Sequence, residues 1–301
     1  MKRNLFIVLL SLVNIISCAF REIEVDKSKL KGSDYRLFQN TPVWELAKAV
    51  WDEDVEEINS ILAKDPKLVD YREEKYGQTL LFLTISNQQY DSFIALIENK
   101  ADVNIHDTFD ATSPLIESLR FKWYDIRFPK KLIEKGADVN YRECGKRTSG
   151  NTSKFFPLLS AVSSGNLEFV KLLIGNGANV NPEGEKVSTL LSSSLCLEEY
   201  EITYFLLQHG ADFRKPLIYR PDYSNSTAQN PKCVEVPIYF EMLLRELMVE
   251  LGSPEHKWKM KIVEFLKQHG VDYYSAPIPE YNIERAKELY PDSWEEYLKK
   301  Y

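Results

Sequence analysis

Apolar residues in the segment 156–181, FPLLSAVSSGNLEFVKLLIGNGANVN, follow two short helical patterns separated by Ser-Ser-Gly-Asn and ended by Gly-Ala-Asn. In the first pattern Leu158, Leu159 and Val162 fall on one face. In the second, Leu167, Val170, Leu172 and Leu173 do the same. Helices of under about 12 residues are marginal in water, so each must bury its apolar stripe against other helices. The pattern therefore predicts further copies of this unit along the chain.

The closing motif of this unit recurs, as KADVN at 100–104, GADVN at 136–140, GANVN at 177–181, GADF at 210–213 and GVD at 270–272. The opening motif recurs as TLLFLT from Thr79, SPLIES from Ser113, FPLLSA from Phe156 and STLLSS from Ser188. Each opening motif ends in a small residue, and these are Thr84, Ser118, Ala161 and Ser193. We expect them where two helices approach closely.

A period near 33 residues with paired short helices is typical of ankyrin repeats, and over residues 41–272 the chain resembles the ankyrin-repeat family. The resemblance implies an all-α solenoid of stacked helix–turn–helix units with projecting loop fingers. One position departs from the family, because the histidine of its TPLH motif is replaced by Phe82, Ile116, Leu159 and Leu191. The hydrogen bonds that this histidine makes between repeats are therefore expected to be absent, with apolar packing in their place.

About six repeats are expected in a domain covering residues 41–281, with insertions at 143–154 and 214–237. The sixth is degenerate, with a longer first helix from Ile238 and a second over 259–270. Residues 282–301 are expected to form capping helices that cover the apolar end of the array with Trp294 and Leu298.

The N-terminus carries the features of an export signal. Lys2 and Arg3 precede an apolar run over residues 5–16, which suits a signal peptide and is shorter than the ~20 residues of a spanning helix. The following Ser17-Cys18 resembles the bacterial lipobox, in which the thiol of the cysteine is lipidated.

This resemblance implies that residues 1–17 are removed and that lipid on Cys18 anchors the protein in a bacterial cell envelope. Because Ala19 is not the aspartate of inner-membrane retention, we expect the outer membrane, facing the periplasm. The sequence does not decide which face of the membrane the protein occupies. The alternatives to a lipoprotein signal are a plain secretory signal cleaved after Ala19 and an uncleaved anchor. Residues 18–40 are polar and of mixed charge, which favours a tether.

Composition and charge limit the partners. The 301 residues are 44% hydrophobic and 28% charged, with a formal net charge of −7. This composition suits a folded chain that can bury a continuous core. Nucleic acid and anionic lipid surfaces both require a basic footprint, so neither is expected as a partner.

Aromatic residues concentrate in the connection between the two helices of the third repeat, namely Trp123, Tyr124 and Phe128. Large rigid side chains dominate the energetics of interfaces, so these residues are candidates for binding a partner. The alternative is that they fold back over the helix ends as local core.

The two insertions provide further candidates, since loops on a rigid scaffold often carry function. The first is rich in Gly, Ser and Thr and locally basic, and we expect it to project as a finger or to be a tolerated surface insertion. The second contains four prolines and no helical pattern, which predicts a long structureless loop. The candidate contact residues in these insertions are Lys146, Arg147, Tyr219 and Tyr223.

The sequence offers little chemistry. None of the zinc, nucleotide or nucleophile motifs is present, so no metal, cofactor or small-molecule substrate is expected. Cys196 lies in a helical pattern and is expected to be a small core residue. Cys144 and Cys233 lie in the two insertions, where a disulfide is possible only if their Cα atoms come within about 7 Å.

The resemblance to ankyrin repeats implies a non-catalytic module that binds another protein, here as an envelope-anchored scaffold or adaptor. An immunity-type lipoprotein that blocks a toxic enzyme is the alternative, since an acidic body suits a basic toxin. The fold alone does not identify the partner. Nothing in the sequence supports catalysis.

Overall fold

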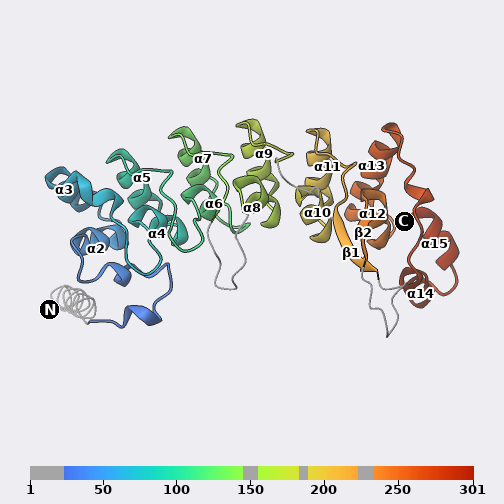
Figure 1. Ribbon diagram of the computed structural model, residues 1–301, viewed down its shortest axis with the longest axis horizontal. Helices are drawn as coiled ribbons and strands as arrows, with labels where there is room; N and C mark the ends of the chain where they lie inside the picture. The colour runs from blue at the N-terminus through green and yellow to red at the C-terminus, as the bar shows by residue number, and fades with distance from the viewer. Residues whose placement is uncertain (1–23, 145–154, 183–188, 223–233) are drawn as a thin grey trace, which may run out of the picture. The chain divides into compact units, whose positions relative to one another are not determined.

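The computed structural model describes residues 24–144, 155–182, 189–222 and 234–301 (Figure 1). Its contacts divide the chain into two compact units. The N-terminal unit is Met1–Ser118 with Arg127–Asp138 and Glu143–Lys154, and the C-terminal unit is Leu119–Ile126 with Val139–Arg142 and Phe155–Tyr301. The domain boundaries at residues 17, 40 and 281 stay predictions. The signal sequence and Cys18 lie outside the described residues.

Helices in the N-terminal unit come in consecutive pairs. Its elements are the short 3-10 helices η1 (Lys27–Lys29), η2 (Tyr35–Phe38) and η3 (Pro66–Asp70) and the α-helices α2 (Trp44–Asp52), α3 (Val55–Lys64), α4 (Leu80–Ser86), α5 (Tyr90–Glu98), α6 (Pro114–Ser118) and α7 (Arg127–Glu134). The start of α3 is set by Asp54, whose carboxylate accepts a hydrogen bond from the backbone N–H of Glu57 at 3.0 Å.

The C-terminal unit continues the pairs and adds one hairpin and a cap. Its elements are α8 (Pro157–Ser163), α9 (Leu167–Gly175), α10 (Thr189–Cys196), α11 (Tyr200–Gln208), β1 (Ile218–Asp222), β2 (Val234–Ile238), α12 (Phe240–Glu246), α13 (Pro254–Gln268), the 3-10 helix η4 (Tyr273–Ser275), α14 (Glu280–Leu289) and α15 (Trp294–Lys300). Asn166 caps α9 by accepting from the backbone N–H groups of Glu168 and Phe169.

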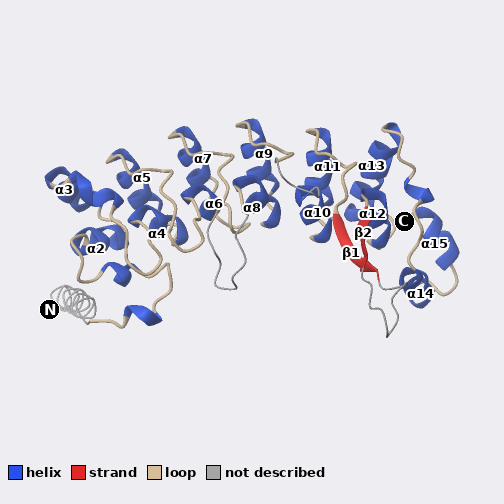
Figure 2. Cartoon of the chain, in the orientation of Figure 1, coloured by secondary structure: helices blue, strands red, loops and turns tan. Residues whose placement is uncertain are grey.

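The pairs stack as the apolar pattern predicted. Within each unit the first helix of one pair lies against the first helix of the next, as α8 lies against α10, and second helices do likewise, as α11 lies against α9 and α13. Of the predicted stripe residues, Leu158, Leu159, Val162, Val170 and Leu173 are at most 8% exposed, whereas Leu167 and Leu172 are only half-buried. Six such pairs occur in the described residues (Figure 2), and the all-α ankyrin-repeat fold is confirmed.

The small residues of the opening motifs mark the close helix contacts, with one correction. Thr84, Ser118 and Ala161 are 0% exposed. In the fifth repeat the buried residue is Ser194, also 0% exposed, and the prediction of Ser193 is wrong by one position. The reason is that Thr189-Leu190-Leu191, and not the run from Ser188, corresponds to Thr79-Leu80-Leu81. The Ser194 hydroxyl accordingly donates to the carbonyl of Leu191 at 3.2 Å, as Thr84 does to Leu81 at 2.7 Å.

Apolar side chains replace the histidine of the TPLH motif, as predicted for the first three openings. Phe82, Ile116 and Leu159 are 1%, 2% and 8% exposed. In the fifth repeat the shifted register places half-buried Ser192 at this position instead of Leu191.

Hydrogen bonds between repeats nevertheless exist, and the sequence analysis missed them. Asn104, Asn140 and Asn181, which end successive closing motifs, use both ends of their amides. Each Nδ2 donates to a carbonyl of the next closing motif, that of Gly136 (3.0 Å), Gly177 (3.1 Å) and Gly210 (2.8 Å). Each Oδ1 accepts a backbone N–H there, from Asp138 (2.9 Å), Asn179 (2.8 Å) and Asp212 (2.8 Å). We call these three paired contacts the asparagine rungs.

The tether predicted over 18–40 is folded in its second half. Tyr35, Leu37 and Phe38 are buried, and the Tyr35 ring stacks on Trp44 at 5.6 Å and on Trp51 at 4.7 Å between ring centroids. Aromatic stacking of this kind adds to the free energy of burial. The segment around η2 is therefore part of the first repeat's core.

The second insertion is a hairpin where it is described, which corrects the prediction of a structureless loop. Strands β1 and β2 pair antiparallel, with Ile218 opposite Ile238 and Tyr219 opposite Pro237. Prolines obscured the strands in the sequence, but both strands of a two-stranded sheet are edges, where proline is tolerated. Arg220 on β1 makes a bidentate ion pair with Glu246 at the end of α12, at 2.5 and 2.6 Å.

The sixth pair has its long helix second, so the predicted long first helix is wrong. Helix α12 ends after seven residues, because the backbone at Leu247 adopts an extended conformation. The 15-residue α13 then begins at Pro254, where Ser253 accepts from the backbone N–H of His256.

The last two helices pack together around Ala286, Tyr297, Leu298 and Tyr301, with Trp294 and Met248 against them. Two cations are buried beside this cluster. Arg245 donates to the carbonyls of Tyr301 (2.9 Å) and Leu298 (3.1 Å). Lys259 donates to the carbonyl of Leu247 at 2.6 Å and lies 4.4 Å from the centre of the Tyr301 ring. Burial, reinforced by the charge of Arg245, holds the pKa of the Lys259 ammonium well below its ordinary value.

The asparagine rungs predict a measurable stability difference. Asn181→Ala removes two hydrogen bonds between neighbouring closing motifs, each contributing about 0.5–1.5 kcal/mol, so the free energy of unfolding should fall by roughly 1–2 kcal/mol in urea denaturation. The matched control is Asn176→Ala, since the Asn176 amide donates only to Leu172 of its own helix end, at 2.7 Å. Equal losses in the two variants would show that the rung adds nothing beyond a local cap.

Candidate functional site

The three aromatic residues predicted between the helices of the third repeat separate in the structure. Trp123 is 75% exposed, whereas Phe128 is 1% exposed. Tyr124 is half-buried. The Phe128 ring lies 4.8 Å from Phe93 and 5.2 Å from Tyr90, measured between centroids, so Phe128 belongs to the core of the N-terminal unit. Its assignment as a contact residue was wrong, and the alternative of local core holds for it.

A residue that the sequence analysis passed over completes an exposed aromatic cluster. The Phe121 ring stacks on Trp123 at 4.6 Å and meets Tyr124 edge-on at 5.2 Å. Phe121 is itself 37% exposed. The name "aromatic cluster" is used below for Phe121, Trp123 and Tyr124. Its signal in the sequence was the run Phe-Lys-Trp-Tyr, of which only the last two residues were singled out.

The loop that carries the aromatic cluster is fastened to the C-terminal unit through Lys122. The carbonyl of Lys122 accepts from the side-chain amide of Asn166 at 3.0 Å, and its ammonium lies 3.6 Å from the carboxylate of Glu199. Gly165 makes room for this contact, because a Cβ there would meet Glu199 Oε1 at 2.3 Å. Gly165 also has φ +68°, a conformation that favours glycine.

A shallow groove of about 270 Å³ lies in the same unit, along the outward side of α11. Helix α11 contributes Glu201, Tyr204, Phe205 and Gln208, which follow the i, i+3, i+4, i+7 spacing of one helix face. The rest of the lining is Leu167 and Lys171 from α9 and Trp258 and Lys261 from α13. We call this feature the α11 groove.

Aromatic rings form the floor of the α11 groove. Tyr204 and Trp258 lie 5.8 Å apart between centroids, and both are half-buried. The Lys261 ammonium lies 3.6 Å from the centre of a Trp258 ring, within cation–π range. An apolar floor is thus bordered by a cation.

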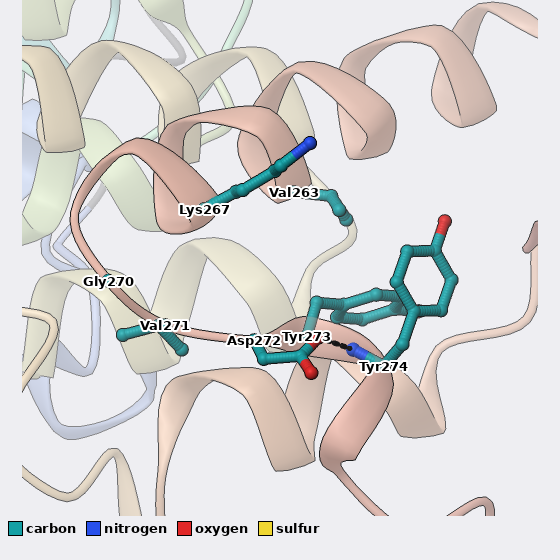
Figure 3. Close-up of a pocket in the computed structure, with 7 residues that line it drawn as sticks. All are labelled: Val263, Lys267, Gly270, Val271, Asp272, Tyr273 and Tyr274. Atoms are coloured by element: carbon teal, nitrogen blue, oxygen red, sulfur yellow. Dashed lines mark hydrogen bonds between the residues drawn. The ribbon is translucent and has the colours of Figure 1, made fainter.

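A larger hollow of about 420 Å³ lies beside the end of α13 and is shown in Figure 3. Its polar groups serve the fold. The Asp272 carboxylate accepts from the backbone N–H of Tyr274 at 3.0 Å, capping η4, and the Tyr273 hydroxyl donates to the carbonyl of Tyr301 at 3.1 Å. Lys267 is the other charged side chain that lines this hollow, and no described residue forms an ion pair with it. The arrangement provides no set of converging groups for a ligand.

The remaining candidates from the insertions are only partly described. Tyr219 on β1 is 42% exposed and available for contact. Lys146, Arg147, Tyr223 and Cys233 lie outside the described residues. Cys144 is exposed and its thiol is free, so the disulfide considered for it is not formed in this structure.

Cys196 is exposed, so its prediction as a core residue is wrong. It is the last residue of α10 and lies outside that helix's buried stripe of Leu190, Leu191, Ser194 and Leu195.

Within the described residues, no three His, Cys, Asp or Glu side chains gather as a metal ion would require. No described helix has the length and apolar character needed to cross a bilayer. His209 and His269 each place Nδ1 near the carbonyl four residues earlier, at 2.8 and 2.7 Å, as helix-end side chains.

Comparison with known proteins agrees with the geometry. A family model described as ankyrin repeats, three copies, matches residues 122–216. The paired helices, the closing motifs and this match together define the repeats as ankyrin repeats. The fold thus belongs to a class of modules that bind other proteins.

Two relatives carry the same kind of repeat. The ankyrin repeat and KH domain-containing protein mask-1 of Caenorhabditis elegans is 25% identical over 204 residues, which is 58% of this chain and 7% of that protein. The ankyrin repeat protein R664 of Acanthamoeba polyphaga mimivirus is 33% identical over 94 residues, 31% of this chain and 53% of that protein. The chain therefore spans about half of one relative and a small part of the other.

Stability measurements should separate the exposed from the buried aromatic residues. Phe128→Ala removes a fully buried ring, so the free energy of unfolding should fall by about 3–5 kcal/mol. Trp123→Ala removes a ring that is 75% exposed and should change it by less than about 1 kcal/mol. Urea denaturation followed by circular dichroism checks both values. Comparable losses would mean that Trp123 supports the fold and is not free for a partner.

Proposed function

We propose that this protein is a non-catalytic protein-binding module held at the bacterial cell envelope by lipid on Cys18, acting as a scaffold or adaptor. The observation that carries the binding function is the aromatic cluster, with Trp123 75% exposed on a loop fastened to a repeat scaffold. Exposed side chains of this size are costly to leave in water, and they mark interaction surfaces.

The geometry of the aromatic cluster suits a binding hot spot. Tryptophan and tyrosine are enriched among residues that contribute most to binding free energy. Stacking of Phe121 on Trp123, together with the Asn166 and Glu199 contacts of Lys122, already orders the loop. A partner therefore pays little conformational entropy to bind it, which favours affinity.

The envelope location is supported by the sequence from Lys2 to Cys18, which joins a basic start, a short apolar run and Ser-Cys. A lipid anchor and a protein-binding surface on the same chain would hold a partner near the membrane. The outer membrane, facing the periplasm, is the proposed location, with secretion as the alternative.

A second function, inhibition of a toxic enzyme, is favoured by the net charge of −7. An acidic surface steers a basic partner into an encounter and raises the association rate. The two functions differ genetically, because deletion of an immunity protein is lethal only when the toxin is present, whereas deletion of an adaptor has no such dependence.

Partner capture tests the binding function. In crosslinked pull-downs from envelope fractions, Trp123→Ala should reduce recovery of the partner at least tenfold relative to the unaltered protein. Leu289→Ala is the matched control, since Leu289 is 52% exposed on α14 but far from the aromatic cluster in sequence. Equal recovery with both variants would exclude the aromatic cluster as the binding surface.

Replacement of the lipidation residue tests the anchor. Cys18→Ser should move the protein from the membrane fraction to the soluble or secreted fraction, because serine lacks the thiol to which the lipid is first attached. Globomycin, which blocks lipoprotein signal processing, should cause a larger precursor to accumulate only when Cys18 is present. Membrane retention of the serine variant, without globomycin-sensitive processing, would contradict the lipoprotein assignment.

A further inference from the structure

We infer that the α11 groove binds a peptide segment of the partner in which an aromatic or aliphatic side chain is flanked by carboxylates. This inference rests on the proposed protein-binding function and adds the site and chemistry of one contact. Four observations on the C-terminal unit carry it: the outward face of α11, the size of the groove, its charge, and its position relative to the aromatic cluster.

The aromatic face of α11 is not required by helix stacking. The residues that pack α11 into the unit are its other face, including Ile202 and Leu206, at 1% and 0% exposure. Tyr204 and Phe205 are additional, half-buried side chains that border the groove. On α9 the residues at the same two positions, directly before its buried Leu173, are exposed Lys171 and half-buried Leu172, so stacking does not require an aromatic ring at either position.

The volume of the α11 groove matches a side chain better than a metabolite. Sites for small molecules generally measure about 300–1,000 Å³ and enclose most of the ligand. The groove measures about 270 Å³, and its floor is a helix surface bordered by side chains from two neighbouring helices. One large apolar side chain anchored over Tyr204, Phe205 and Trp258 would fill much of it.

The charge of the groove selects an acidic partner segment. Its lining holds two lysines and one glutamate, a positive balance on a chain whose net charge is −7. The Lys171 ammonium is already 2.9 Å from the carboxylate of Glu168. Lys261 lies over Trp258 and has no carboxylate within ion-pair distance among the described residues. A carboxylate next to the anchoring side chain would pair with Lys261.

The α11 groove begins where the aromatic cluster is fastened. Leu167, which lines the groove, follows Asn166, and Asn166 bonds the carbonyl of Lys122. Glu201, at the same end of α11, lies two residues after Glu199, the ion-pair partner of Lys122. A segment that contacts the aromatic cluster therefore has an adjoining surface on which to continue.

A displayed library of random 16-residue peptides, selected on the purified full-length protein, tests this inference. We expect the selected peptides to share an aromatic or leucine residue flanked by Asp or Glu. Synthetic copies labelled with a fluorophore should bind Lys261→Glu and Tyr204→Ser variants at least tenfold more weakly in anisotropy titrations. Both side chains are at the groove surface, and circular dichroism confirms that each variant is folded.

Lys267→Glu is the matched control, because Lys267 lies on the same helix as Lys261 but outside the groove. It makes the same charge change and should leave peptide affinity within twofold. Loss of affinity in this variant equal to that in Lys261→Glu would show a general charge effect and overturn the inference.

The remaining outcomes separate this inference from the proposed function. Peptides that lose affinity with Trp123→Ala but bind the groove variants normally would overturn the groove and support the aromatic cluster. Peptides that lose affinity only with the groove variants would support the groove and leave the aromatic cluster without a role. Selection of basic peptides, or no shared motif, would overturn the inference.

Discussion

Helices too short to be stable alone must bury their apolar faces against neighbours, and this constraint organises the whole chain. The seven residues of α8 and the nine of α9 each leave an apolar stripe that the adjacent pair covers. Each repeat therefore supplies part of the core of the next, and stability accumulates between neighbours. The same constraint explains why the ends require special treatment: η2 packs under the first pair, and α14 and α15 pack around Tyr301 at the other end.

Burial aligns the helices, and polar contacts then fix the register of the loops. Without the histidine of the TPLH motif, that task falls to the asparagine rungs, since an amide both donates and accepts. In the first repeat Asp70 makes only half of such a contact. Its carboxylate accepts a hydrogen bond from the backbone N–H of Asp102 at 2.9 Å, but a carboxylate has no proton to donate. The scaffold thus holds these closing loops in place with few groups.

Most of the fold followed from the sequence, because apolar spacing and helix-ending motifs are local signals. The errors arose where local signals are ambiguous. The run from Ser188 to Ser194 reads the same in two registers, and only burial showed that Ser194 occupies the close contact. The candidate site was harder, since the sequence gives no reason to separate Trp123 from Phe128. In the structure Trp123 lies exposed in the loop before α7, whereas Phe128 lies on the buried face of α7 itself. The α11 groove requires α9 and α13 beside α11, which no single segment reveals.

The asparagine rungs also explain where this chain tolerates added length. The rung between Asn140 and the motif at 177–181 fixes two closing loops, and the first insertion, 143–154, begins three residues after Asn140. Extra residues there leave both clamped loops in place and cost mainly loop-closure entropy, which rises by about 0.6 kcal/mol for each doubling of length. Such a position lets evolution, or a protein engineer, change the length of this connection while the described contacts on either side of it are kept.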